Sequence, residues 1–253
     1  LPSTSYLEAK DRKNSYHRTI TTLRHRPMLT GRLKLYKDWT VSIYLPLMIE
    51  QDMIEDTRSN GGRRKKAHLT SLNNTVSIYN FSHNENTGVV SNFSFAYSRS
   101  EALPSMGYLL DLIDDTNPLF ISRGNANLQN SVNNGINMWY QYSNSKHMQN
   151  YGATASWNQT SNAVASTTTY DRSTGVTTYQ PRNINGNWSL SSYVNLERTV
   201  DKKDRLTLKQ HVGFNYNHNV DYITETLNQI ATPLRSVVHN YTISEFLGCV
   251  YKY

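Results

Sequence analysis

Four carboxylates that lie close together in the sequence are the first candidates for catalytic residues. They are Glu50, Asp52, Glu55 and Asp56. A pair of carboxylates at a fixed separation performs glycoside hydrolysis, one as the acid and the other as the base or nucleophile. Here no histidine or aromatic pocket is evident beside them, and they stand at what reads as the end of a strand. We therefore expect no glycosidase site.

Metal ligands are the second possibility. His211 and His218 are seven residues apart, so on one straight strand they point to opposite faces and cannot hold one ion. The spacings H-x-x-x-H and C-x-x-C do not occur. Asp111, Asp114 and Asp115 could suggest calcium, but the EF-hand pattern is missing. We expect solvated loop acids and no metal site.

Other enzyme signatures are also missing from the sequence. The G-x-S-x-G, P-loop and dinucleotide-binding patterns do not occur. The single cysteine, Cys249, allows no internal disulfide and reads as a small apolar filler near the end of a strand. We expect no catalytic or cofactor-binding residue, no cofactor and no enzyme activity. The sequence does not identify any substrate-binding residue.

The formal net charge of +7 raises the question of a nucleic-acid partner. The densest basic run is Arg63-Arg64-Lys65-Lys66, and it follows Asn60-Gly61-Gly62. This context predicts a turn or loop tip, and no nucleic-acid-binding signature accompanies the run. A solvated basic surface is the better interpretation, and we expect no nucleic-acid partner.

The composition favours β structure. Only 18% of the residues are charged, and the polar bulk is Asn, Ser, Thr, Gln and 18 Tyr, which suit strands and turns. No stretch approaches 18 consecutive apolar residues, so no transmembrane helix is predicted. Barrel strands alternate, however, and averaged hydropathy misses them. The chain opens on Leu1-Pro2-Ser3 without an export signal, which suggests that Leu1 is an internal position of a longer protein.

Alternation with a period of two dominates the sequence and is clearest from Arg205 to Tyr216. One face of this run is almost wholly apolar and the other is polar or small. We expect the apolar side to face lipid and the polar side to face a lumen. The apolar set includes Leu206, Leu208, Val212 and Phe214, and the polar set includes Thr207, Lys209, His211 and Asn215. Similar runs occupy 29–36, 39–47, 75–81, 89–97, 136–142, 151–157, 188–196 and 241–251.

Turn residues separate these runs and indicate how many strands the chain contains. Asp201–Asp204 is a compact polar reversal between two strongly alternating runs, as a hairpin requires. Further turn signals stand at 37–38, 60–62, 86–88, 173–175 and 185–186. We expect roughly ten to twelve antiparallel strands, the number that part of a large barrel would contain.

Strand length and aromatic placement favour a membrane barrel over a soluble sandwich. The run from Arg205 can extend to about Tyr222, which is longer than the roughly 9–11 tilted residues that cross a bilayer. Aromatic residues also stand toward the ends of runs, where rings tolerate both lipid and water. They are Tyr36, Trp39, Tyr97, Trp157, Trp188, Tyr216, Tyr222, Tyr251 and Tyr253.

One segment, 101–130, breaks the alternation and reads as a long loop in which Ser105–Ile113 could form a helical turn. It carries Leu103-Pro104-Ser105, then Asp114-Asp115-Thr116-Asn117-Pro118-Leu119, then Gly124-Asn125-Ala126-Asn127-Leu128. Gly124 is expected to permit a backbone turn that other residues resist. None of these residues looks catalytic, and we interpret the loop as a structural signature.

These motifs resemble the barrel region of TonB-dependent receptors, particularly the outer-membrane β-barrel family of the Bacteroidetes. In that family a Pro-Ser step is followed by D-x-x-N-P-L and then by G-N-P-x-L, where this chain has Ala126 in place of the last proline. The stretches 170–176 and 181–186 and the step Tyr44-Leu45-Pro46-Leu47 are also similar. The resemblance spans about 29 to 222 in consistent order.

The resemblance implies a fold and a set of partners. Members of the family have about 22 strands, an N-terminal plug and a segment that binds an inner-membrane energy transducer. Residues 1–253 show neither plug nor transducer segment and stop in mid-pattern, so we expect one domain that is a partial barrel, with a long loop at about 101–130. The expected partners are outer-membrane lipid, the rest of the barrel and plug, a surface lipoprotein and the transducer, and the expected location is the bacterial outer membrane.

Two functions remain open from the sequence. The first is a receptor of the TonB-dependent type that takes up an unidentified nutrient such as a glycan, a peptide or a metal chelate. The second is a soluble or surface-anchored β-rich module that binds glycans through exposed Trp and Tyr. Strands of about ten or more residues with one apolar face would favour the first.

Overall fold

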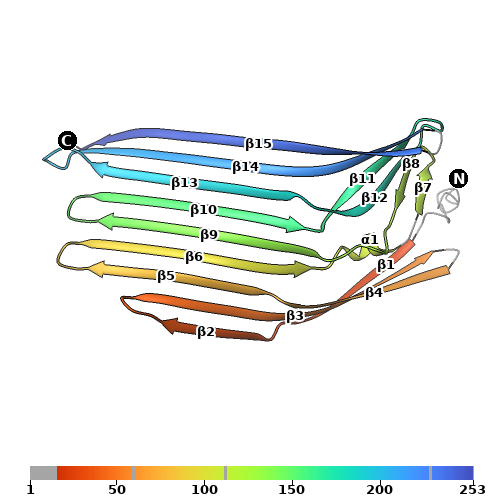
Figure 1. Cartoon of the computed structure of the whole chain (residues 1–253), viewed down its shortest axis with the longest axis horizontal. Helices are drawn as coiled ribbons and strands as arrows, with labels where there is room; N and C mark the ends of the chain where they lie inside the picture. Colours follow the sequence, from red (N-terminus) through yellow and green to blue (C-terminus); the bar gives the residue numbers. More distant parts are fainter. Residues whose placement is uncertain (1–15, 59–60, 111–112, 228–229, 253) are drawn as a thin grey trace, which may run out of the picture.

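The computed structural model of the protein describes residues 16–58, 61–110, 113–227 and 230–252. Within these ranges the chain forms one 15-stranded sheet and a single short helix (Figure 1). All strand pairings are antiparallel except β11 with β14 and β12 with β8. The prediction of a nearly all-β, mostly antiparallel fold is confirmed. The elements are β1 (Tyr16–His25), β2 (Met28–Lys34), β3 (Trp39–Arg58), β4 (Gly61–Leu72), β5 (Asn74–Asn84), β6 (Val89–Ala102), α1 (Met106–Leu109), β7 (Ile113–Asn117), β8 (Phe120–Arg123), β9 (Ser131–Asn144), β10 (Gln149–Ser161), β11 (Ala163–Asp171), β12 (Thr177–Ile184), β13 (Asn187–Thr199), β14 (Leu206–Leu227) and β15 (Ile230–Tyr251).

Nine neighbouring strands make the main sheet, in the order β2-β3-β5-β6-β9-β10-β13-β14-β15, and every neighbouring pair is antiparallel. At one end they are joined by short turns at 35–38, 85–88, 145–148 and 200–205, and we call this the short-turn end. The turn signals read at Lys37-Asp38, 86–88 and Asp201–Asp204 are confirmed. The other end carries all the longer connections (Figure 1).

The predicted number of strands, ten to twelve, is too low. The additional strands lie at the end opposite the short turns, where β1, β4, β7, β8, β11, β12 and α1 form what we call the cap (Figure 1). The segment read as a loop at about 101–130 contains α1, β7 and β8, and β8 pairs with β12. The strands β7 and β8 were missed because five or fewer residues give too few repeats for a period of two to be visible.

The basic run at 63–66 is not a loop tip, as the sequence suggested, but part of strand β4. It lies opposite the acidic outer half of β3, with Arg63 opposite Asp56 and Arg64 opposite Glu55. Opposite charges on facing strands stabilise the pairing of the two strands. The prediction failed because the preceding glycines read as a turn, although Gly61 and Gly62 already pair with β3.

The described part of the cap holds the hydrophobic core of the structure. Ile54 of β3 is fully buried and packs with Met106, Leu109 and Leu110 from the α1 segment, with Ala67 and Leu128 against them. The helical turn expected within Ser105–Ile113 is present as α1. No helix in the described ranges is long and apolar enough to span a membrane.

The main sheet is not closed. β15 pairs with β14, and β2 pairs with β3, but these two outermost strands do not pair with each other. Figure 1 shows β15 and β2 at opposite borders of the sheet. The structure is therefore an open sheet, and it does not test the expectation that it is part of a 22-stranded barrel.

Candidate functional site: two faces of the sheet and the cap

The register of the main sheet collects the apolar side chains of nearly every strand on one side, which we call the apolar face. A row in the middle of this face joins Phe95, Met138, Ala155, Ser192, Phe214 and Ile243 across six strands. Many of these side chains are open to the surroundings: Ile243 is 68% exposed and Met138 is 43% exposed. A continuous exposed apolar face of this extent requires an apolar environment.

The opposite side, which we call the polar face, carries small and polar side chains in the same register. The neighbouring row contains Ala96, Asn137, Ser156, Ser191, Asn215 and Thr242. Polar contacts cross between strands on this face: Ser156 and Ser191 share a hydrogen bond of 2.6 Å, and Lys209 pairs with Glu197 at 2.8 Å. One face can therefore meet lipid while the other meets water.

Strand β14 has the phase that the sequence predicted. Leu208, Val212 and Phe214 lie on the apolar face, opposite Arg198, Val194 and Ser192 of β13. Thr207, Lys209, His211 and Asn215 lie on the polar face. His211 and His218 fall on opposite faces, as their spacing predicted: His211 bonds Tyr193 at 2.7 Å, while the His218 ring stacks on Trp188.

Aromatic residues frame the apolar face. On the side toward the cap, Trp157 and Trp188 lie near Tyr216, whose ring is 4.9 Å from that of Trp188. On the side toward the short turns, Tyr142 stacks on Tyr151 at 5.7 Å between ring centroids, and Trp39 meets Phe93 edge-on at the same distance. Two such girdles border the apolar band of membrane barrels. Tyr253, which was also predicted to have this role, lies outside the described residues.

The height of the apolar band matches a membrane. The Trp188–His218 row and the Arg198–Leu208 row are ten residues apart along β13 and β14. At about 3.3 Å per residue this is about 33 Å along the strand, or about 25 Å across a bilayer for strands tilted by about 40°. The strands β3, β14 and β15, with 20, 22 and 22 residues, continue well beyond the band into the cap.

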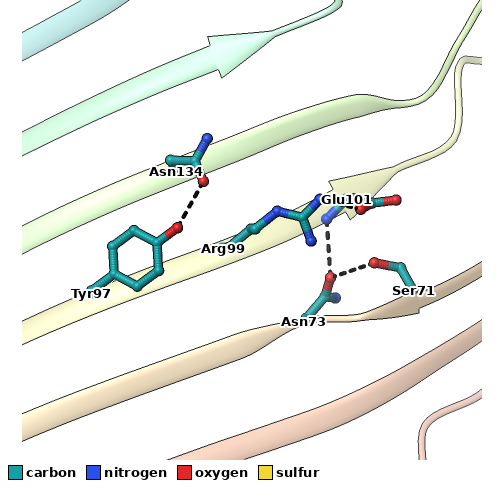
Figure 2. A network of polar contacts seen from close by, with 6 residues as sticks. All are labelled: Ser71, Asn73, Tyr97, Arg99, Glu101 and Asn134. Atoms are coloured by element: carbon teal, nitrogen blue, oxygen red, sulfur yellow. Dashed lines mark hydrogen bonds and ion pairs between the residues drawn. The ribbon is translucent and has the colours of Figure 1, made fainter.

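Figure 2 shows the chemistry changing at the cap side of the band on β6. The Tyr97 hydroxyl donates a hydrogen bond to Asn134 Oδ1 at 3.0 Å, directed away from the apolar rows. Two residues further along the same face, Arg99 pairs with Glu101 at 2.6 Å, and the backbone N–H of Glu101 donates to Asn73 Oδ1 at 3.0 Å. An ion pair takes the place of apolar side chains at this level, so the lipid-compatible surface ends near Tyr97.

In the cap, amide side chains tie the 124–129 segment to strand β12. Asn125 Nδ2 donates to the carbonyl of Pro181 at 2.9 Å, and Gln180 Nε2 donates to the carbonyl of Gly124 at 3.2 Å. Asn183 accepts from the N–H of Gln129 at 2.7 Å and donates back to its carbonyl at 2.9 Å. The cap motifs that were separate in the sequence therefore meet in space.

Gly124 is required for a reason other than the one predicted. Its backbone is not in the left-handed region; instead, a Cβ at this position would overlap the carbonyl oxygen of Leu110. The 124–125 step lies directly on the chain leaving α1, and the N–H of Asn125 donates to the carbonyl of Tyr108 at 2.6 Å. Close backbone approach explains the glycine.

Comparison with models of known protein families gives a match that covers most of the chain. Residues 54–245 match the model of the outer membrane protein beta-barrel family. The chain belongs to this family. No curated protein and no solved structure matches it. The match covers most of the main sheet and part of the cap, and it supports the predicted location in the bacterial outer membrane.

Family membership also orients the sheet. Barrels of the outer membrane have short turns on the periplasmic side and longer loops outside the cell. By this rule the four turns of the short-turn end are expected on the periplasmic side and the cap outside the cell. In this orientation the apolar face is the side suited to lipid and the polar face is the side suited to water.

The carboxylates that opened the analysis lie in the outer half of β3. Asp56 pairs with Arg18 at 2.9 Å, Glu50 with Arg24 at 2.7 Å, and Glu55 with Arg64 at 3.1 Å. Glu50, Asp52 and Asp56 are buried, whereas Glu55 is exposed. Glu50, Glu55 and Asp56 are components of an ion-paired sheet, whereas the buried Asp52 Oδ1 has no hydrogen-bond partner among the described residues.

The metal hypothesis gains no support from the geometry. Among the residues that the structure describes, no group of three or more His, Cys, Asp and Glu side chains could hold an ion. Asp114 lies in β7, whereas Asp111 and the Asp115 side chain fall outside what is described.

Proposed function

We propose that this chain is a barrel portion of an outer-membrane receptor of the TonB-dependent type, which takes up a nutrient across the outer membrane. The observation that carries the proposal is the pairing of a lipid-compatible face with a polar face across nine strands. A polar inner face gives a hydrophilic solute a path, and the sequence motifs of the cap resemble those of this receptor type.

The open borders of the main sheet support the partners in this proposal. Unpaired backbone groups in hydrocarbon cost several kcal/mol each, so a membrane sheet is stable only when it is closed. β15 and β2 are therefore completed by further strands of the same barrel, and the enclosed space is filled by a plug. An energy transducer of the inner membrane and a surface lipoprotein are further proposed partners, whereas nucleic acid is not.

The described residues of the inner face offer contacts for a passing solute. His211 lies between Tyr193 and Phe246, with ring centroids at 5.9 Å and 5.6 Å. Near the periplasmic turns, Asn150 and Thr199 line a hollow of about 300 Å³ on the same face, and Asn150 Oδ1 has no partner. Such groups bind polar solutes weakly, as a transport path requires, and we propose that the protein is not an enzyme.

The alternative is a soluble or surface-anchored glycan-binding module. Exposed aromatic rings such as Tyr241, at 72% exposure, could stack on sugars in water. The apolar face argues against this alternative, because a sheet with this much exposed apolar surface would aggregate without lipid.

The test is a deletion of the gene that encodes the chain, followed by growth on single glycans, peptides and metal chelates as the limiting nutrient. The proposal predicts loss of growth on one nutrient class and loss of uptake of that nutrient when the proton-motive force is dissipated. Normal growth on all classes, or uptake that is insensitive to the uncoupler, would contradict it. A chain that is soluble without detergent would favour the glycan-binding module.

A further inference from the structure

The apolar face is not flat at its periplasmic end, where a groove of about 620 Å³ crosses strands β10, β13, β14 and β15. Tyr151 of β10 and Leu196 of β13 line it on one side, Leu247 and Cys249 of β15 line it on the other, and Leu208 of β14 lies between them. These five residues all belong to the apolar face by register. Cys249 is smaller than the Leu and Tyr residues that precede and follow it on the same face of β15, which leaves the space open.

One cationic group lines the groove from this same face. Arg198 lies opposite Leu208 on β13, in the row that borders the periplasmic side of the apolar band. Its sequence neighbour Glu197 points to the other face and pairs with Lys209 there at 2.8 Å. No carboxylate in the described ranges pairs with Arg198. The groove therefore joins an apolar trough to an uncompensated positive charge at the level of the lipid head groups.

The surroundings of the groove determine what can occupy it. The groove is continuous with the surface that meets hydrocarbon, so lipid acyl chains reach it without crossing water. Its volume falls within the range of about 300–1,000 Å³ that is usual for small-molecule sites. An arginine guanidinium matches the geometry of a phosphate, to which it can donate two hydrogen bonds.

We propose that this groove is a binding site for one phospholipid of the periplasmic leaflet, with an acyl chain in the trough and the head-group phosphate on Arg198. Gln210, which also lines the groove, donates to Glu245 at 3.2 Å. Glu245 lies opposite Val212, so its carboxylate is nearer the middle of the apolar band than Arg198 is, and it lies away from the proposed phosphate position. Arg198 and Cys249 thus determine two separable parts of the recognition, the charge of the head group and the room for the chain.

The proposal is tested by native mass spectrometry of the protein purified from outer membranes in detergent, with phosphatidylglycerol added as the probe. The wild-type protein is expected to retain one phosphatidylglycerol after the other lipids dissociate. Arg198→Gln should weaken the retained lipid about tenfold, because one charge-assisted contact is lost, and Arg198→Lys should restore most of the binding. Cys249→Phe should weaken it as well by filling the trough, and Cys249→Ala should not.

The matched control is Lys203→Gln in the β13–β14 turn, which removes the same charge at the same end of the sheet but outside the groove. Equal weakening by Lys203→Gln and Arg198→Gln would show non-specific attraction and overturn the proposal. Unchanged binding in Cys249→Phe, or a polypeptide in place of a lipid in the purified protein, would overturn it too. The wild-type and Arg198→Lys proteins keep the test informative if one of the other variants does not fold.

Discussion

Asn183 of β12 and Gln129, 54 residues earlier in the chain, bond to each other as two strands would. The amide oxygen of Asn183 accepts from the N–H of Gln129 at 2.7 Å, and its amide nitrogen donates to the Gln129 carbonyl at 2.9 Å. The same nitrogen donates to the carbonyl of Asn162 at 2.9 Å. One side chain therefore connects the 124–129 segment to the β10–β11 turn and to β12, and it organises the outer cap.

Replacing this side chain should loosen the cap and leave the membrane strands intact. In Asn183→Ala the three bonds are lost, and we expect local opening at Gln129 to become easier by about 1–3 kcal/mol. Hydrogen exchange at the 127–131 peptide measures this change. Asn219→Ala, at an exposed asparagine with no side-chain bond in the structure, is the control. Equal protection at 127–131 in both variants would contradict the assignment.

The close contact at Gly124 leads to a second prediction. Gly124→Ala forces the chain leaving α1 to move, because its Cβ would overlap the Leu110 carbonyl, and overpacking of this kind costs about 1–3 kcal/mol. The readout is the cleavage rate of the cap by an added protease on intact cells. Gly31→Ala is the matched control, since nothing lies within 4 Å of a Cβ at that position. Equal protease resistance of the Gly124→Ala and Gly31→Ala proteins would contradict the close-packing explanation.

The periplasmic turn between β13 and β14 provides a prediction about pH. The N–H groups of Leu206 and Arg205 donate to Asp201 Oδ1 at 2.6 and 2.7 Å, that of Lys203 donates to Oδ2, and the bond from Leu206 contributes most to lowering the Asp201 pKa below its ordinary value. A lowered pKa means that the ionised carboxylate stabilises the folded turn. This stabilisation is present above the unfolded-state pKa of about 3.9 and disappears as the pH falls through the folded-state value.

We therefore expect Asp201→Asn to lower the unfolding temperature at pH 6 and to have no effect once both pKa values lie above the pH. The measurement is the difference in unfolding temperature between the two proteins from pH 7 down to pH 2.5. Asp204→Asn, in the same turn but with no backbone donor to its side chain in the structure, is the matched control. A wild-type advantage that grows toward acid would reverse the assigned sign.

The sequence predicted the faces of the sheet well because alternation is a local property. The phase of Leu208, Val212 and Phe214 follows from a period of two, and every strand that pairs in register inherits it. The girdle positions Trp157 and Trp188 were visible for the same reason. These are the features that one strand expresses without knowledge of its neighbours.

The cap could not be predicted in this way, since its contacts join distant parts of the chain. Nothing near Asn125 indicates that its partner is the carbonyl of Pro181, 56 residues later. One signal was available and was missed: the acids at 50–56 and the basic run at 63–66 have complementary charge at the spacing of a hairpin. The groove beside Arg198 also needs the register of four strands and is invisible in any single one.

The two faces should differ in how much an added charge lowers the free energy of unfolding. Phe214 lies in the middle row of the apolar face beside Ser192 and Ile243, whereas Asn215 lies on the polar face beside Ser191 and Thr242. Arginine at a lipid-facing midplane position costs about 2–4 kcal/mol, so Phe214→Arg should lower the free energy of unfolding by at least this amount. Asn215→Arg should change it far less. Equal losses in a refolding assay with lipid vesicles would mean that the assigned faces are wrong.

The most direct test of a lipid-facing and a lumen-facing side is an accessibility scan along β14 in the assembled outer-membrane protein. Single cysteines are placed from Leu208 to His218 in a Cys249→Ser background, and each carries a nitroxide spin label. Collision rates with oxygen, which dissolves in lipid, and with a water-soluble nickel chelate are then measured. The account predicts alternation with a period of two, with oxygen dominant at Val212, Phe214 and Tyr216 and the chelate dominant at His211, Gly213 and Asn215. A scan without alternation, or with the opposite phase, would contradict it.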